Sequence, residues 1–168
     1  MSDNHADIVV RGGVTVGSQG LLPADVFIRG DKIHSLERPG GPRTADREID
    51  ARGRMVLPGL IDAHLRPVYA DRIDSLSRAA VEEGLTTLIP YIGAVKAWGE
   101  TKTLLEAVED FIREGENTSL VDFSLHCTLL QDDLADADRT MPALIERGVT
   151  SFKAFMAYAR RGMKLEDE

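Results

Sequence analysis

The sequence predicts an α/β protein in which a strand-rich segment, residues 1–57, precedes a segment of alternating strands and helices, residues 58–168. Three features predict this class: short β-type runs between glycine turns, a nearly continuous apolar strand in MVLPGLIDAH, and a β-α-β-α-β-α-β order after it. Short connections of this kind suit a barrel or a doubly wound sheet. Four strands make half of an eight-stranded barrel.

The first segment contains the β-type runs DIVVRGGVTV and ADVFIRGDKIHSLE, and a further short strand is expected around Arg47 to Ile49. The pairs Gly12-Gly13 and Gly30-Asp31 are typical of hairpin turns, because glycine adopts the backbone angles that tight turns require. These strands are too few to close a sheet on themselves. They predict part of a small β-sandwich.

The second segment shows helical periodicity in DRIDSLSRAAVEEG, where one face is apolar and Gly84 is expected to follow the helix end. The expected apolar face consists of Ile73, Leu76, Ala80 and Val81. TTLIPYIG predicts the next strand, and TKTLLEAVEDFIREGEN predicts a second helix. Thr103 and Glu106 have the spacing of a capping box, which predicts where that helix begins.

The remaining elements follow the same alternation. VDFSLHCTLL predicts a third strand, TMPALIERG a short helix with Thr140 as its N-cap, and TSFKAFMAY a fourth strand. His126 in the third strand is interpreted as a core histidine. Cys127 beside it has no nearby helix N-terminus or base that would activate the thiol.

The composition narrows the possible partners and the compartment. Apolar residues make up 43% of the 168 residues and charged residues 29%, which is typical of a folded globular chain. The net charge of −8 argues against nucleic acid or an anionic membrane as a partner. A single cysteine permits no internal disulfide, and no secretory signal or membrane-spanning stretch is visible, so a cytoplasmic location is expected.

Three positions carry residue types that could perform chemistry. Asp62 and His64 end the first parallel strand, and strand carboxyl ends form the active-site face of α/β folds. A histidine there is a metal-ligand candidate, although a buried structural histidine is the simpler interpretation. Its neighbour on the same face, Arg66, cannot be a ligand, because a guanidinium has no lone pair to offer.

The other two candidates are Lys153 and Tyr158, which lie in and just after the fourth strand. A lysine in an apolar strand loses hydration, which favours a neutral amine that can form a Schiff base or a carbamate. Alternatively, the side chain extends from an edge strand to water. Tyr158 either donates a hydrogen bond to an oxyanion or covers the barrel rim.

Taken together, these segments resemble the start of the dihydropyrimidinase/hydantoinase family of cyclic amidohydrolases. DIVVRGGVTV and ADVFIRGDKIHSL are similar to the family's N-terminal sandwich strands, and VLPGLIDAHLRPV matches its P-G-x-I-D-x-H-x-H segment except at Arg66. Its Gly-x-Thr-Thr pattern occurs in EEGLTTLIPY, and DFSLHCTLL resembles its third strand. SFKAFMAY resembles the segment that holds a carboxylated lysine. The resemblance covers the whole chain but only the first part of the family's length.

The resemblance implies a metal-dependent (β/α)8 TIM-like barrel plus a sandwich built from both chain ends, of which this chain would be the first half. It also implies two divalent ions, usually zinc, and a metal-bridging hydroxide that attacks the ring carbonyl. Carried over by position, His64 would be a zinc ligand, Lys153 the carboxylated bridging ligand, and Tyr158 the oxyanion donor. The remaining family ligands, two histidines and an aspartate, would lie beyond residue 168.

The implied function is hydrolysis of non-peptide C–N bonds in a small cyclic amide, by a homo-oligomer that is commonly tetrameric in the family. Hydantoin, dihydropyrimidine, allantoin and dihydroorotate all stay open as substrates. Arg66 favours an alternative, a non-catalytic homologue that acts as a scaffold or interaction module, and a truncated product without independent function is a third reading. The isolated chain is expected not to hydrolyse these rings, and to aggregate or pair through its open strand edge.

Overall fold

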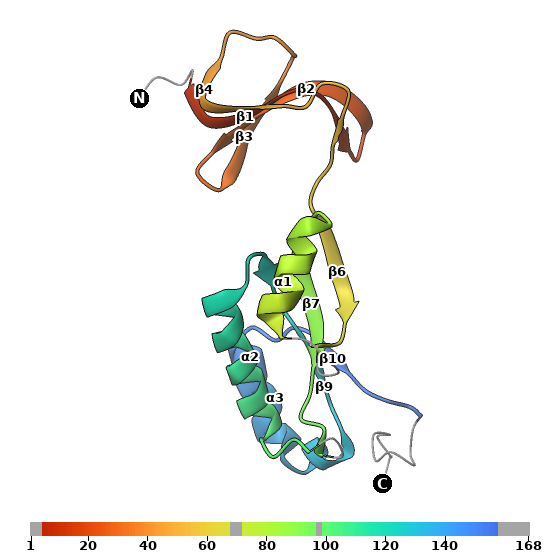
Figure 1. Cartoon of the computed structure of the whole chain (residues 1–168). Coiled ribbons are helices and arrows are strands. Elements are labelled where there is room, and N and C mark those ends of the chain that lie inside the picture. Colours follow the sequence, from red (N-terminus) through yellow and green to blue (C-terminus); the bar gives the residue numbers. More distant parts are fainter. Residues whose placement is uncertain (1–4, 68–71, 97–98, 158–168) are drawn as a thin grey trace. The chain divides into compact units, whose positions relative to one another are not determined.

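In the computed structural model, residues 5–67, 72–96 and 99–157 are described. They form two compact units, Met1–Pro58 and Gly59–Glu168, and the two are considered separately (Figure 1). Within the described residues, no helix has both the length and the apolar character that crossing a membrane requires.

The first unit is a five-stranded sheet with the order β3-β2-β1-β4, in which β5 also pairs with β1. Its strands are β1 His5–Gly17, β2 Gly20–Arg29, β3 Lys32–Glu37, β4 Thr44–Asp50 and β5 Met55–Val56. The pairs β1–β2 and β2–β3 are antiparallel, whereas β4 and β5 run parallel to β1. The expected hairpin at Gly30-Asp31 is confirmed, since it joins β2 to β3 and Gly30 has a φ of 54°.

The expected hairpin at Gly12-Gly13 is wrong, because β1 continues through both glycines. The register of β1 against β2 shifts between Val10 and Gly13, which is a β-bulge, and Gly12 adopts a φ of 77°. The Gly12 N–H donates to the fully buried Asp25 at 2.8 Å, and the Arg11 guanidinium donates to the other oxygen of that carboxylate at 2.8 Å. The glycines therefore bend a strand around a buried carboxylate instead of ending it.

The second unit is a parallel sheet with helices on one side of it (Figure 1). Its order is β10-β9-β7-β6, with β8 also on β7, and every pair is parallel. The elements are β6 Leu60–Leu65, α1 Ile73–Glu82, β7 Leu85–Ile92, α2 Leu104–Thr118, β8 Asp122–Phe123, β9 His126–Thr128, the 3-10 helix η3 Gln131–Asp136, α3 Ala137–Glu146 and β10 Phe152–Lys153. This is the expected α/β half-barrel.

Two expected strands are interrupted. MVLPGLIDAH is not continuous: β5 ends at Val56 in the first sheet and β6 begins at Leu60, because Pro58 has no N–H for a strand ladder. The segment VDFSLHCTLL forms the two short strands β8 and β9 instead of one. In the first case only β6 joins the parallel sheet, whereas in the second case β8 and β9 both pair with β7.

The structure contains the helices that the sequence predicts, but their start positions and buried faces differ in part from the prediction. The capping box of Thr103 and Glu106 is confirmed at the start of α2. Val81 is 51% exposed, so its place on the apolar face of α1 is wrong, and Ser77, one turn after Ile73, is buried there instead. Thr140 is not an N-cap, because η3 runs directly into α3 and places Thr140 inside the helix.

Candidate functional site at the carboxyl ends of the strands

The core of the second unit fixes which face of each strand is covered. Leu65 of β6, Ile92 of β7, Cys127 of β9 and Phe152 of β10 all belong to, or pack against, the apolar clusters that include residues of the helices. Since successive side chains of a strand point to opposite faces, their immediate neighbours must point away from the helices. The alternation therefore places the two neighbours of each core residue on the uncovered face, and the ring or charged neighbours among them are the candidates for chemistry.

The residues selected in this way are His64, Tyr91, His126 and Lys153. They come from four strands that are far apart in the sequence, yet Tyr91 lies directly beside His126 in the sheet register. His64, Tyr91 and Lys153 lie at the carboxyl ends of β6, β7 and β10, where barrel geometry places a functional face, and His126 begins β9. Asp62 lies on the same strand as His64, and its carboxylate accepts the His64 backbone N–H at 2.9 Å.

Ring contacts connect the group. The Tyr91 ring centroid lies 5.0 Å from that of His64 in an edge-on arrangement, and 4.8 Å from that of His126 in a stacked one. His126 is half-buried and its Nδ1 is hydrogen-bonded to the Ser151 hydroxyl, so the interpretation as a core histidine is wrong. A histidine held by stacking and by a hydroxyl has a fixed ring orientation, which suits ligand contacts.

Lys153 extends over aromatic faces. Its Nζ lies 4.4 Å from the Tyr91 centroid and 4.7 Å from the Phe155 centroid, distances at which a cation and a ring attract each other. Burial, and after it the positive charge of Arg66, lowers the pKa of Lys153 from its ordinary value. The side chain is half-buried, so neither full burial nor free extension into water describes it.

Arg66 determines whether the face fits a metal. Its Nη2 lies 3.2 Å from Nε2 of His64, and because a guanidinium only donates, Nε2 is the acceptor and the ring proton sits on Nδ1. The lone pair that a metal would need is thus used by an arginine. Within the part of the chain that the structure describes, no group of three or more His, Cys, Asp or Glu side chains could hold an ion. Arg66, which has no lone pair to offer, stands where the resemblance implies a second histidine ligand, so this strand does not supply the pair of ligands that two divalent ions would need.

Tyr158, the expected oxyanion donor, lies outside the described residues. Cys127 is fully buried, and burial followed by the charge of Asp133 raises the pKa of its thiol to about 12, so the thiol is inert. The sequence did not identify Tyr91, which contacts the rings of His64 and His126, or Ser151, which is hydrogen-bonded to His126. The alternation of Tyr91 with the apolar Ile92 is the signal that could have identified it.

Comparison with known proteins gives a consistent set of relatives, although no family model matches the sequence. A D-hydantoinase of Streptomyces coelicolor is 32% identical over 161 residues, which are 89% of this chain and 33% of that protein. A dihydropyrimidinase of Dictyostelium discoideum is 28% identical over 174 residues, 99% of this chain and 34% of that protein. The chain therefore spans about a third of the length of these relatives.

Solved structures agree with these relatives. A D-hydantoinase structure superposes with a TM-score of 0.76 at 32% identity, over 96% of this chain and 35% of the other. An N-acyl-D-glutamate deacylase from Bordetella bronchiseptica, solved with zinc and a phosphonate inhibitor, has a TM-score of 0.65 at 16% identity, over 94% of this chain and 41% of the other. The second likeness concerns the fold alone.

Proposed function

This chain belongs to the hydantoinase and dihydropyrimidinase family, of which it matches the N-terminal third, and we propose that it supplies the first four barrel strands of a cyclic amide hydrolase. The observation that carries this proposal is the convergence of His64, Tyr91, His126 and Lys153 on the open face at the strand carboxyl ends. The bond cleaved would be a non-peptide C–N bond of a small ring. The expected cytoplasmic location and homo-oligomer belong to the same proposal.

The described side chains would bind and orient the ring in this proposal. Tyr91 offers a flat face against which a planar cyclic amide can stack. Arg66 keeps N–H donors besides the one aimed at His64, and these can donate to a ring carbonyl. Tyr158 would donate to the developing oxyanion, as the resemblance implies. No step is assigned to zinc, because the guanidinium of Arg66 uses the lone pair of His64.

A second candidate is a non-catalytic homologue that acts as a scaffold, and the contact between Arg66 and His64 favours it. In that case the face at the strand ends would descend from a zinc site but would no longer bind zinc. Lys153 would then be an amine resting on aromatic rings, without a carboxylate added to it.

One experiment separates the two candidates. The chain and its Arg66→His variant are each mixed with the C-terminal two thirds of a D-hydantoinase relative, with zinc, and ring opening of dihydrouracil and hydantoin is followed. The hydrolase proposal expects no turnover by the chain alone and turnover by the mixture that contains the unaltered chain, whereas turnover by the Arg66→His mixture alone favours the non-catalytic candidate. If both mixtures assemble, as size-exclusion chromatography would report, and neither opens a ring, the non-catalytic candidate is correct.

A further inference from the structure

Four polar side chains are buried in the described part of the chain, and three of them are hydrogen-bonded. The hydroxyls of Thr15 and Ser77 donate to backbone carbonyls at 2.8 and 3.0 Å, and the carboxylate of Asp25 accepts from a guanidinium and from backbone N–H groups. Thr128 is the fourth, and although only 7% of it is exposed, its hydroxyl has no hydrogen bond to any described residue. Buried polar groups are normally paired, so the Thr128 hydroxyl is available to a ligand.

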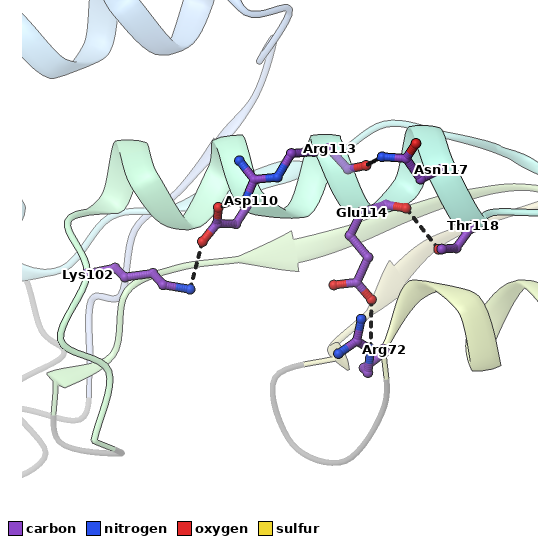
Figure 2. A pocket seen from close by; sticks show the side chains of 7 residues that line it. All are labelled: Arg72, Lys102, Asp110, Arg113, Glu114, Asn117 and Thr118. Atoms are coloured by element: carbon purple, nitrogen blue, oxygen red, sulfur yellow. Dashed lines mark hydrogen bonds and ion pairs between the residues drawn. The ribbon is translucent and has the colours of Figure 1, made fainter.

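The hollow beside α2 is the contrasting case, because the charged side chains that line it are paired with one another (Figure 2). Lys102 lies 2.7 Å from Asp110, and Arg72 lies 3.0 Å from Oε1 of Glu114. Apart from this ion pair, Oε1 of Glu114 is the only fully buried side-chain oxygen or nitrogen of the described residues without a hydrogen bond. The unpaired hydroxyl of Thr128 therefore keeps some access to solvent and is not sealed in the core.

Strand alternation places the Thr128 side chain on the uncovered face of the sheet. Cys127 packs in the apolar core that includes residues of α2 and α3, so Thr128, the last residue of β9, points the other way. In the sheet register Thr128 lies beside Lys153 of β10. The hydroxyl is therefore at the carboxyl ends of the strands, on the same face as the candidate site.

Gly93, the residue after β7, makes room for this side chain. A Cβ built on Gly93 would lie 2.9 Å from the Cβ of Thr128 and 3.5 Å from its Cγ2. Gly93 does not have a positive φ, so the glycine is required by the space that Thr128 occupies and not by a turn. The methyl group of Thr128 lies against the Gly93 backbone, which leaves the hydroxyl directed away from it.

The chemistry of a hydroxyl indicates which ligand suits this position. A hydroxyl both donates and accepts hydrogen bonds, which matches the amide edge of a ring, where a carbonyl stands beside an N–H. His126 lies two residues earlier on the same face, about 7 Å along the strand. Its Nδ1 is bonded to Ser151, and no partner of its second ring nitrogen is found among the described residues. The two side chains together offer polar contacts to one small planar ring.

We propose that Thr128 is a substrate-binding residue, whose hydroxyl holds the amide edge of a small cyclic amide at the carboxyl end of β9, with His126 beside it. This inference rests on the proposed function, since it takes the ligand to be the ring that the proposed function names. It requires binding alone and no turnover. It also assigns the Thr128 hydroxyl to the ligand and not to folding.

The test is a titration of the whole chain with dihydrouracil, followed by the NMR shifts of backbone amides. We expect saturable shifts at His126, Thr128 and Lys153, and none with cyclohexanone, which has the same ring size and a carbonyl but no ring N–H. Thr128→Val removes the hydroxyl and keeps the shape, so it should weaken dihydrouracil binding about three- to tenfold, as loss of one hydrogen bond does. Thr128→Ser keeps the hydroxyl and should restore most of the affinity.

A matched variant and a stability measurement separate a binding role from a structural one. Thr87 lies on the same face of β7 as Tyr91, about 13 Å earlier along the strand, so Thr87→Val should leave dihydrouracil affinity unchanged. Thr128→Val should not lower the urea midpoint, because no hydrogen bond of the folded chain is lost.

The inference is overturned if the chain binds no dihydrouracil, if cyclohexanone shifts the same amides equally, or if Thr128→Val binds as the wild type does. It is also overturned if Thr87→Val weakens binding as much as Thr128→Val, or if Thr128→Val lowers the urea midpoint. Binding that depends on Thr128, together with no ring opening in the mixtures described above, would refute hydrolysis and support this inference.

Discussion

Gly59 precedes β6, the strand that carries His64 and leads into Arg66, and its replacement by alanine tests how that strand is positioned. A Cβ built on Gly59 would overlap Oγ1 and Cγ2 of Thr86 and would lie 2.6 Å from its Cβ. Real Cβ atoms essentially never approach another atom to within 3.0 Å, so β6 or β7 must shift. The close approach of the Thr86 side chain to the Gly59 backbone explains why a glycine follows Pro58.

The size of the effect follows from the overlap. Forcing extra atoms into a packed contact typically costs about 1–3 kcal/mol. Taking ~2 kcal/mol and a urea dependence of ~2 kcal/mol per molar, the unfolding midpoint of the second unit should fall by about 1 M. Gly17→Ala, in the first unit, controls for the glycine-to-alanine change itself, because a Cβ at Gly17 has no neighbour within 4 Å and its φ lies outside the left-handed region. That variant should leave the midpoint unchanged.

Removing the atoms that clash provides the stricter test. Thr86→Ala takes away Oγ1 and Cγ2 but keeps the Cβ, so it should rescue Gly59→Ala only in part. Thr86→Gly removes all three atoms, so in that background Gly59→Ala should carry no further cost in urea unfolding followed by circular dichroism. If Gly59→Ala unfolds at the wild-type urea concentration, or if Thr86→Gly gives no rescue, the proposed contact between the strands is not what the glycine serves.

Three further predictions concern other parts of the chain. Asp25→Ala leaves the N–H of Gly12 and the guanidinium of Arg11 without their buried acceptor, and should destabilise the first unit by about 3 kcal/mol, measured by urea unfolding; a loss below about 1 kcal/mol would contradict the role of that carboxylate. Thr103→Ala should cost about 1 kcal/mol through the lost N-cap of α2. Hydrogen bonds from the backbone N–H of Thr103, and after it from its hydroxyl, lower the pKa of Glu106, so the stabilisation is present above the ordinary pKa and is lost as pH falls through the lowered one. Thr103→Ala removes only the hydroxyl's share, so the gap between wild type and Thr103→Ala should narrow in acid, and a gap that widens in acid would contradict the capping box. Cys127 should react with a thiol reagent only after unfolding in urea, and rapid reaction of the native chain would contradict its burial.

Periodicity was a sound guide to the fold because each element buries one face. The alternation around Ile92 and Cys127, and the apolar stripe of α2, follow directly from packing against a common core, so the sequence pattern predicts them. The order of parallel strands follows from the short helical connections. Each of these features can be predicted from the residues of its own segment.

The errors have a different origin, since they depend on contacts that local patterns do not contain. Gly12-Gly13 is a bulge because Asp25, distant in sequence, accepts the Gly12 N–H. Thr140 lies inside α3 because η3 leads into the helix without a break. The pairing of Tyr91 with His126 depends on strand register, and a single sequence does not specify which residues of neighbouring strands meet.

The candidate site was partly predictable for the same reasons. His64 and Lys153 are noticeable as polar residues in apolar strands, and Arg66 is noticeable as a cation where the resemblance implies a metal ligand. The hydrogen bond from Arg66 to His64 was not predictable, because two side chains on one strand can also point apart. That contact is the one that changes the expected chemistry of the face.

The zinc content of the purified chain tests the central claim most directly. The chain and its Arg66→His and His64→Asn variants are equilibrated with zinc, passed over a desalting column and measured by atomic emission. Because the guanidinium of Arg66 uses the Nε2 lone pair of His64, we predict well below one zinc per chain for the wild type, no further loss in His64→Asn, and more retained zinc in Arg66→His than in the wild type. One or more zinc ions retained per wild-type chain and lost in His64→Asn would contradict the account.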